Sequence, residues 1–533
     1  MHDSQESIIR SVKRFFSGTF ISRLTGLGRE VTMAAAFGTL PAVAAFWMAF
    51  RFAYLFRRIF GEGALNIVFI PHFEMLRKTD PKKGALFFYD LCSVLIGLLL
   101  AITLVTIAVL GSVLYFGSPG AANQEVIRLT ILLLPALLFI SLYALNTSIL
   151  NCEGSYFLPS VAPACVNVIW MSALFFLWKF PAERAMEYLA MIIVLAFAMQ
   201  WLITLPRVYR FLSKELGDGW WKGRRSTIKE VGKILGPFLI GLLGVTATQI
   251  NSALDALFAR TADPQGPAFL WYAIRIQQLP LALFGIGLTG ALLPPIARAI
   301  QNKDEKKYVR FLNFALNRSF SLMLPFSAAL FALGFAGINL IYGHGAFSSN
   351  AIFETTLCLW AYATGLFPMT VVLIFASAFY AQKNYRTPTL LASVSVGFNV
   401  GLNAWFVFGL KMGAVSVAVA TAAASMLNAF ALGYFLKKKQ RFSLRLSSAK
   451  TGICSLTATI FTIIFGYWVF QDNTLLWVIG RPLTAFPREI TAQLIVFGSE
   501  VFCFGGIFLA TAYLLRFSLP FEWVRFGGLE TRK

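Results

Sequence analysis

The chain has 533 residues, of which 58% are hydrophobic and only 13% are charged. Soluble domains carry about 25% charged residues, so this composition excludes a soluble protein and indicates a polytopic membrane protein. The net charge of +22 is also a property of nucleic-acid-binding proteins. Here, however, the basic residues lie in short segments between apolar runs, as the positive-inside rule describes. We therefore expect no nucleic-acid partner.

Apolar runs long enough to span a bilayer, about 20 residues each, recur along the whole chain. Turn residues and charged residues separate these runs, and the pattern predicts an all-α membrane protein with about 14 transmembrane helices. The second span is interrupted by the glycines at Gly61 and Gly63. The expected spans are 15–38, 41–73, 85–117, 125–150, 157–180, 185–206, 230–259, 266–297, 309–341, 350–381, 386–410, 412–436, 449–470 and 489–516.

The connections between these spans predict the orientation of the chain. Most Lys and Arg residues fall in every second connection, on the side that also holds both termini. Because basic connections stay in the cytoplasm, we expect both termini to be cytoplasmic. The polar start of the chain is unlike a cleaved signal peptide. The longest basic connection, Arg207 to Lys233, contains Trp220 and Trp221 and is either an amphipathic segment on the inner leaflet or a solvated linker.

Arginines inside the apolar spans are the most informative functional signal. A charge at the bilayer centre costs about 2.5 kcal/mol or more, so such residues usually face a bundle interior or a watery cavity. The planar fork of arginine also suits phosphate groups, because it donates two parallel hydrogen bonds. The pattern predicts a cavity that binds an anion, and hence a transporter. The arginines in question are Arg23, Arg29, Arg51, Arg57, Arg58 and Arg275.

Two clusters surround these arginines. In the first, Arg23 and Arg29 are six residues apart and project about 120° from each other on a helix. An alternative for Arg29 is an ion pair with Glu30 that only holds helices together. In the second, a double arginine precedes Glu62, which is flanked by glycines. This pattern favours a helix broken at membrane depth, which is tolerated only beside a cavity or within protein.

These segments resemble a known family. SRLTGLGRE at 22–30, FGT at 37–39 and LFRRIFGEGALNIVFIP at 55–71 resemble the MurJ (MviN) family of lipid II flippases. WYAIRIQQLPLALFGIGLTGALLP at 271–294 is similar to a further segment of that family. The family belongs to the multidrug/oligosaccharidyl-lipid/polysaccharide (MOP) exporter superfamily. The resemblance extends over essentially the whole chain.

The resemblance implies two six-helix lobes around a central cavity, with two C-terminal helices forming a hydrophobic groove. The corresponding domains are 1–215, 216–445 and 446–533. The implied activity is the movement of lipid II from the inner to the outer leaflet of the bacterial cytoplasmic membrane by alternating access, in support of peptidoglycan synthesis and cell shape. No catalytic residue is expected. The implied cavity residues are Arg23, Arg29, Arg57, Arg275, Ser22 and Glu62.

The same resemblance implies a monomer that contacts membrane lipids and, transiently, the cell-wall synthesis machinery. The sequence departs from the family pattern near Arg275, where Ile274 and Gln278 stand in place of two acids. Ala44 likewise aligns with an Asp of the family. We therefore expect a more positive cavity than is usual in the family.

Some members of the family also bind sodium, and the matching positions lie far along this chain. Asn399 and Asn403 share a helix face, as do Val417 and Thr421, because each pair is four residues apart. Asn403 replaces the usual second acid. The alternative to a sodium site is a set of interhelical hydrogen bonds. The implied sodium ligands are Asp255, Asn399, Asn403, Val417 and Thr421.

Two other functions deserve comparison with lipid II flipping. A related MOP exporter would move another lipid-linked oligosaccharide or an amphipathic compound. A membrane enzyme acting on the same lipid would need acid and base side chains near the interface. The nearest candidates form no recognisable motif, so we expect no enzyme; they are His72, Glu74, Asp80 and Asp90.

Overall fold

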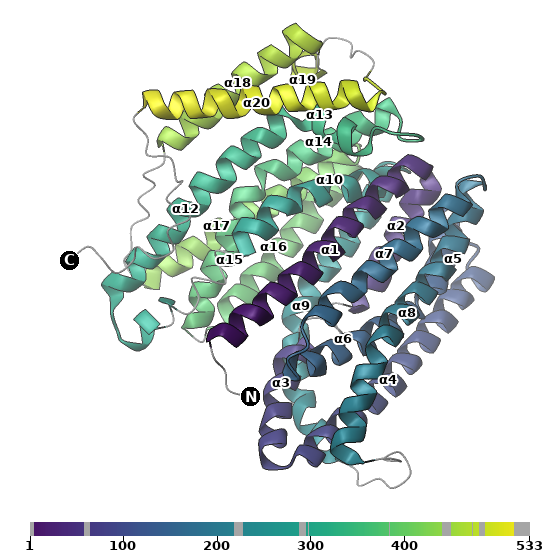
Figure 1. Ribbon diagram of the computed structural model, residues 1–533. Coiled ribbons are helices and arrows are strands. Elements are labelled where there is room, and N and C mark those ends of the chain that lie inside the picture. Colours follow the sequence, from purple (N-terminus) through teal and green to yellow (C-terminus); the bar gives the residue numbers. More distant parts are fainter. Residues whose placement is uncertain are drawn as a thin grey trace. The chain divides into compact units, whose positions relative to one another are not determined.

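The computed structural model describes residues 5–57, 64–217, 227–286, 295–296, 298–382, 384–439, 449–471, 473–478 and 486–515 (Figure 1). Every regular element in these ranges is a helix. Helices satisfy their own backbone hydrogen bonds, which is what a bilayer demands of a spanning segment. The chain divides into two compact units. Unit 1 comprises Met1–Ala268 with Gly345–Phe347, and unit 2 comprises Phe269–His344 with Ser348–Lys533.

Unit 1 is built from α1 to α9. Within it α1 runs along α7, α8 packs on α6 and α7, and α9 packs on α2, α3 and α4. The bounds are α1 Gln5–Phe37, α2 Pro41–Arg57, α3 Ala64–Thr79, α4 Pro81–Phe116, α5 Ala121–Leu133, α6 Ala136–Cys152, α7 Phe157–Leu177, α8 Ala182–Leu216 and α9 Ile228–Ala262.

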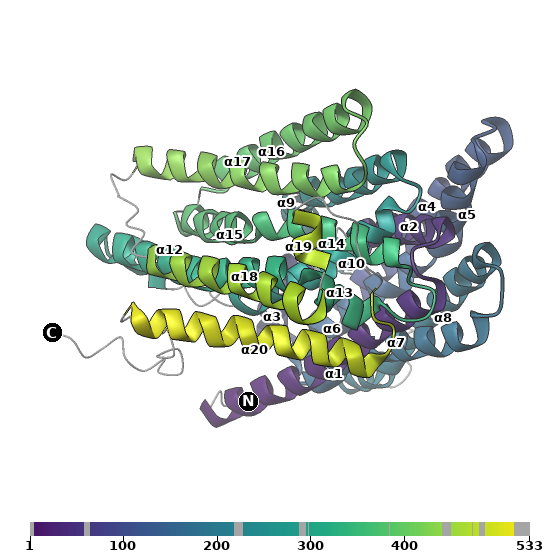
Figure 2. The same ribbon diagram turned by 90° about the horizontal axis from the view of Figure 1, so that it is seen from above.

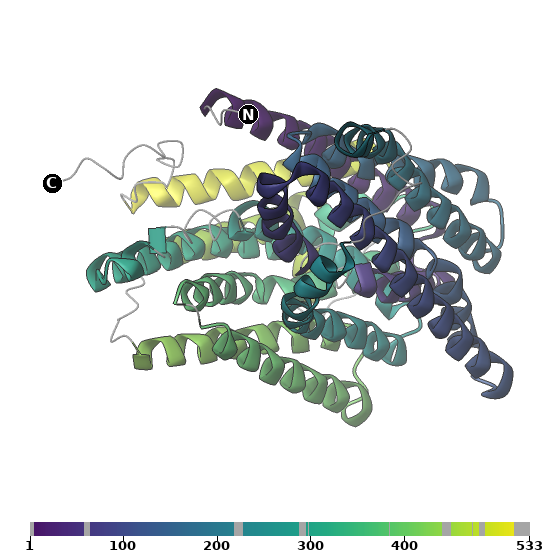
Figure 3. The same cartoon turned by 90° about the horizontal axis from the view of Figure 1, so that it is seen from below.

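Unit 2 holds the remaining helices, beginning within α10. In it α16 and α17 run side by side, as Figures 2 and 3 show, and α18 lies along α20. The bounds are α10 Gly266–Pro280, η2 Leu281–Ile286, α12 Glu305–Ala332, α13 Gly334–Tyr342, α14 Ser349–Thr364, α15 Leu366–Ala381, α16 Arg386–Ala404, η3 Trp405–Gly409, α17 Val415–Lys439, α18 Ala449–Phe470, α19 Asn473–Val478 and α20 Ile490–Leu514.

The helices follow the spans predicted from the sequence. Among the described residues, nine helices or joined helix pairs are long and apolar enough to cross a membrane. The pair α5 and α6, bent by 41°, makes a tenth. The other four expected spans coincide with α1, with α2 and α3, with α9, and with α10 and η2. Of these, α2 and α10 are short, with 17 and 15 residues, whereas α1 holds Arg23 and Arg29, whose charge lowers its hydropathy. The prediction of an all-α polytopic membrane protein is confirmed.

Two predicted boundaries are wrong by about ten residues, because α1 begins at Gln5 rather than at residue 15 and α8 ends later than residue 206. The basic connection was expected to begin at Arg207, but α8 continues to Leu216. The extension is amphipathic, and its apolar side chains join the same core cluster as residues of α3 and α4. Burial of that face therefore keeps the chain helical beyond the apolar run. The buried side chains are Val208, Phe211 and Leu212. Trp220 and Trp221 lie outside the described residues, so both readings of that segment stay open.

The contact division does not follow the expected lobes. It groups α9 with unit 1, because α9 packs on α2, α3 and α4. It groups α18 to α20 with unit 2, because α18 packs on α12. The lobes implied by the family are bodies that move during transport, and contacts in one conformation do not test movement. The expected domain boundaries therefore stay predictions.

A buried acid of α4 holds the start of α9. Asp90 is fully buried. Its carboxylate accepts hydrogen bonds from the backbone N–H of Thr227, at 2.6 Å, and from the Thr227 hydroxyl, at 2.9 Å. An anion is stabilised at a helix N-terminus by unpaired N–H groups and by the helix dipole. Asp80 has a similar structural role, since it accepts from the N–H of Lys82 and caps α4.

The end of α1 makes a backbone contact with the segment Gly345–Phe347. The N–H of Ala346 donates to the carbonyl oxygen of Ala35 at 2.9 Å. Gly38 and Gly345 both have positive φ, at 58° and 54°. A Cβ added at Gly38 would collide with the carbonyl oxygen of Ala346. Only glycine adopts this conformation without strain and permits so close an approach.

We expect Gly38→Ala to lower the thermal unfolding temperature of the purified protein. Alanine in the left-handed region costs about 1–2 kcal/mol, and its methyl group would also push the facing backbone away. Gly97→Ala on α4 is the matched control, because a Cβ there meets nothing within 4 Å. Alanine is favoured over glycine in a helix, so the control should be no less stable than wild type. Circular dichroism in detergent measures both; equal unfolding temperatures would contradict the close approach.

Candidate functional site

Arg29 is held by partners from α1 and α7. Its Nη1 donates to Oδ1 of Asn167 at 3.1 Å. Its Nη2 lies 2.5 Å from Oε1 of Glu30 and forms an ion pair with it. The guanidinium carbon lies 4.7 Å from the ring centroid of Trp170. The Arg29 side chain is only 12% exposed, so its charge is removed from solvent but is paired and hydrogen-bonded, as burial requires.

Two glycines bring α7 close enough to α1 for these contacts. A Cβ at Gly26 would lie 3.5 Å from Nδ2 of Asn167, and one at Gly28 would lie 3.2 Å from the sulfur of Met171. Small residues let membrane helices approach closely, so that polar side chains of one helix reach the backbone of the next. The first cluster predicted from the sequence is therefore a site where helices α1 and α7 meet.

Ser22 and Arg23 lie one to two turns before this site on α1. The carbonyl oxygen of Ser22 accepts from Nδ2 of Asn167 at 3.1 Å and from the hydroxyl of Thr25 at 3.0 Å. Arg23 is exposed. In the part of the chain that the structure describes, no ion pair involves Arg23. The two arginines of this cluster thus differ, since one is buried with partners and the other is open to the surroundings.

The second arginine cluster is only partly described. The helix α2 ends at Arg57, and nothing is described of the Arg57 side chain. Arg58 and Glu62 lie outside the described residues. The next helix begins at Ala64. The predicted roles of Arg57 and Glu62 stay predictions.

Arg275 lies on α10 of unit 2, against an aromatic ring. Its guanidinium carbon is 4.2 Å from the ring centroid of Trp271, which precedes it by one helical turn. Trp271 is buried and Arg275 is half-buried. A cation over an indole face gains about 0.5–2 kcal/mol, most where water is excluded. The residues near Arg275 that the sequence comparison expected to be acidic are Ile274 and Gln278. The guanidinium of Arg275 contacts the indole ring of Trp271.

Four of the five implied sodium ligands lie in unit 2, where they form a chain of hydrogen bonds. Nδ2 of Asn403 donates to Oδ1 of Asn399 at 2.5 Å. Nδ2 of Asn399 donates to Oγ1 of Thr421 at 3.3 Å. The Thr421 hydroxyl donates to the carbonyl oxygen of Val417 at 3.0 Å. Of these three bonds, the one from Asn399 to Thr421 joins α16 to α17, as the interhelical alternative predicts; the bonds do not decide between that alternative and a sodium site.

The fifth implied ligand belongs to unit 1. Asp255 on α9 is 6% exposed. Its Oδ2 accepts from Nδ2 of Asn251, one turn earlier, at 3.3 Å. Among the residues that are described, no three His, Cys, Asp or Glu side chains gather closely enough to hold a metal ion. A cation bound by the implied set would therefore depend on amide, hydroxyl and carbonyl oxygens together with one carboxylate.

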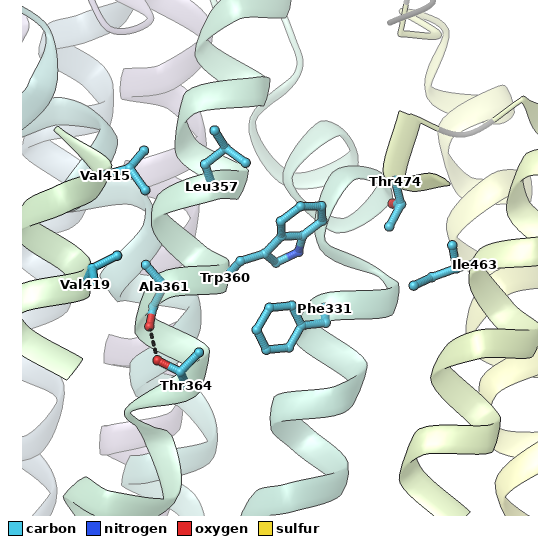
Figure 4. Close-up of a pocket in the computed structure, with 9 residues that line it drawn as sticks. All are labelled: Phe331, Leu357, Trp360, Ala361, Thr364, Val415, Val419, Ile463 and Thr474. Carbon is cyan, nitrogen blue, oxygen red and sulfur yellow. Dashed lines mark hydrogen bonds between the residues drawn. The ribbon is translucent and has the colours of Figure 1, made fainter. Parts of the chain in front are cut away.

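Unit 2 also contains an apolar pocket of about 350 Å³, shown in Figure 4. It is formed by α12, α14, α17, α18 and α19 and lined by Phe331, Leu357, Trp360, Ala361, Thr364, Val415, Val419, Ile463 and Thr474. The Thr364 hydroxyl donates to the carbonyl oxygen of Ala361 at 2.7 Å, the bond drawn in Figure 4. No charged side chain lines this pocket, so it suits hydrocarbon rather than an anionic head group.

Sequence reasoning missed the two partners of Arg29 on α7. Asn167 and Trp170 lie in an uncharged, apolar span with no motif around them. One signal was available, because polar residues within membrane spans are costly and usually have a partner. Nothing in the sequence indicates that this partner is Arg29, which precedes Asn167 by 138 positions.

A helical bundle with arginines at membrane depth is typical of membrane transporters. The fold agrees with this class. A solved structure titled "Lipid II flippase MurJ, inward closed conformation" superposes with a TM-score of 0.68 at 24% identity, over 92% of this chain and 98% of that one. An inward-facing MATE family transporter of the MOP superfamily superposes with a TM-score of 0.64 at 15% identity, over 81% of this chain and 98% of that one.

Sequence comparison then gives the family. The family model described as "Lipid II flippase MurJ" matches residues 33–485. A probable lipid II flippase MurJ of Chlamydia muridarum (strain MoPn / Nigg) is 32% identical over 523 residues, covering 96% of this chain and 95% of the relative. The chain belongs to the lipid II flippase MurJ family.

Proposed function

We propose that the protein moves lipid II from the inner to the outer leaflet of a bacterial cytoplasmic membrane by alternating access, and so supplies peptidoglycan synthesis. Membership of the MurJ family supports this function. The structural observation that carries it is the guanidinium of Arg29, which is largely buried and is contacted by Asn167, Glu30 and Trp170. Arginine suits the pyrophosphate of a lipid-linked precursor, because its fork matches phosphate oxygens.

The family is one of transporters, and the protein is accordingly a flippase and not an enzyme. A MOP exporter of another lipid-linked oligosaccharide or of an amphipathic compound is the second candidate, since MATE transporters share the fold. Arginines at membrane depth disfavour cationic compounds electrostatically. We further propose that the protein works as a monomer, with transient contacts to the cell-wall synthesis machinery.

We expect Arg29→Ala and Arg275→Ala to abolish translocation without preventing membrane insertion. Each change removes a charge that would contact the substrate and also relieves a cost of insertion. Arg29→Lys should fail as well, because an ammonium group donates no parallel pair of hydrogen bonds. Arg184→Ala is the matched control, since Arg184 is exposed at the start of α8.

The measurement is translocation of fluorescent lipid II in proteoliposomes, with an undecaprenyl-phosphate sugar as the competing cargo. Lipid II should move at least about tenfold faster than the sugar carrier. Wild-type translocation by Arg29→Ala would exclude an anion site at this arginine. Preference for the sugar carrier would instead favour the second candidate.

We propose that both termini are cytoplasmic, on the basis of the basic connections. The two ends of α4 test this orientation, because a helix of 36 residues is about 54 Å long and must cross the bilayer. In a protein without native cysteines, Gly120→Cys should react with a membrane-impermeant thiol reagent added outside cells. Lys78→Cys should react only after permeabilisation. The reverse pattern would invert the proposed orientation.

We propose that Asn399, Asn403, Thr421 and the carbonyl of Val417 bind sodium together with Asp255. The gathering of the first four within unit 2 supports this proposal. Sodium should then raise the unfolding temperature above that in potassium at equal ionic strength, because a ligand that binds only the folded state stabilises it.

Asp255→Asn and Thr421→Val should abolish this difference between the two ions. Ser377→Ala is the control, since among the described residues that hydroxyl bonds within α15, to the carbonyl of Leu373. The Ser377→Ala variant should show the same difference in unfolding temperature between sodium and potassium as wild type. Equal unfolding temperatures of the wild-type protein in sodium and potassium would show that these side chains serve as interhelical hydrogen bonds.

A further inference from the structure

Asn167 and Trp170 of α7 form the surroundings of Arg29, yet neither residue carries charge. They are three residues apart, so they share one face of α7, and both face α1. Asn167 is 6% exposed and Trp170 is fully buried. Both contact the same guanidinium, one through a hydrogen bond and one through its ring face. Their combined effect is to fix where the Arg29 side chain can lie.

The orientation of the Asn167 amide is determined by its other contacts. Its Nδ2 lies 3.1 Å from the carbonyl oxygen of Ser22 and 3.1 Å from Oγ1 of Thr25. A backbone carbonyl oxygen can only accept a hydrogen bond, so the NH2 group must face Ser22. The amide oxygen is therefore turned toward Arg29. It accepts from a guanidinium, which can only donate, so every contact of this amide pairs a donor with an acceptor.

The ring of Trp170 is itself held in place by other aromatic side chains. Its centroid lies 5.6 Å, 5.8 Å and 5.4 Å from those of Phe46, Trp47 and Phe50. These three rings lie on α2 and are at most 1% exposed. The indole is thus held in place by its neighbours, and the guanidinium carbon of Arg29 lies 4.7 Å from its ring centroid. A guanidinium that contacts an aromatic ring in this way still has its N–H groups for hydrogen bonds.

Glu30 alone would not orient Arg29. The two residues are adjacent in α1, and a pair of long neighbouring side chains can form an ion pair in many rotamers. The Nε of Arg29 is buried and has no acceptor among the described residues. The guanidinium is therefore not fully satisfied by its protein partners. An incoming phosphate oxygen would supply an acceptor, provided that the fork is presented in a defined direction.

We propose that Asn167 is a positioning residue for substrate binding, which holds the guanidinium of Arg29 beside the ring of Trp170 so that its fork meets the pyrophosphate in one orientation. This inference rests on the proposed function. Asn167 acts through Arg29 and does not itself contact the lipid. Loss of the amide oxygen weakens substrate binding, because the arginine then samples rotamers that point its fork elsewhere and must be ordered again for each substrate molecule.

The test measures initial rates of lipid II translocation in proteoliposomes at several mole fractions of lipid II, and thermal unfolding in detergent. Asn167→Leu should raise KM by about tenfold or more and leave the rate at saturation within about twofold of wild type. A change in KM at constant turnover identifies lost substrate binding. Asn146→Leu is the matched control. Asn146 is also buried in unit 1 and also bridges two helices, by donating to Thr204 at 2.8 Å, and among the described residues it has no hydrogen bond to an arginine.

Asn167→Asp separates positioning from stability. It keeps an oxygen for Arg29 but replaces the NH2 group that donates to Ser22, so it should unfold at a lower temperature than wild type and yet keep KM within about threefold. A purely structural role predicts instead that KM follows the unfolding temperature in all three variants. Equal KM values in Asn167→Leu and Asn146→Leu would overturn the positioning role of Asn167 but leave the proposed function standing. A wild-type protein that does not move lipid II would overturn the proposed function and the inference with it.

Discussion

A guanidinium buried in a protein must be paired with a negative charge and hydrogen-bonded, and this requirement organises the packing of α1 on α7 in unit 1. Arg29 meets it with an acid from its own helix and with an amide and an indole from α7. The contact is possible because Gly26 and Gly28 remove side chains where α7 approaches. The aromatic cluster of α2 then packs behind the indole. Three helices are thus arranged around a single charge.

Much of the fold was predictable, because a bilayer allows few solutions. Each expected apolar run corresponds to a helix or a helix pair among the described residues. The predicted end of α8 was wrong because the helix was expected to end where its run of apolar residues ends. Beyond that limit α8 continues as an amphipathic helix, whose apolar face is buried by α3 and α4. Tertiary packing of this kind leaves only a weak signal in the sequence.

The charged residues of the site could be predicted from the sequence, but the residues that contact them could not. Arg29 and Arg275 stand out in a sequence because charge in an apolar span is rare. Asn167 and Trp170 stand out less, since neither carries a charge, and their role depends on which helix lies opposite. Likewise, the residues implied as sodium ligands form an amide and hydroxyl chain between α16 and α17. The donor and acceptor directions in such a chain are set by geometry, which spacing along the sequence does not reveal.

The junction between the end of α1 and residues 345–347 depends on the main chain. The hydrogen bond from Ala346 to Ala35 uses backbone atoms, and the two glycines beside it contribute by having no side chain. Such a junction is indifferent to most side-chain replacements but sensitive to the number of residues between α13 and α14. Both its length and its two glycines are therefore constrained, because a Cβ at Gly345 or Gly38 would collide with the carbonyl oxygen of Ala35 or of Ala346. In a surface loop, where insertions are ordinarily tolerated, that is an unusual restriction.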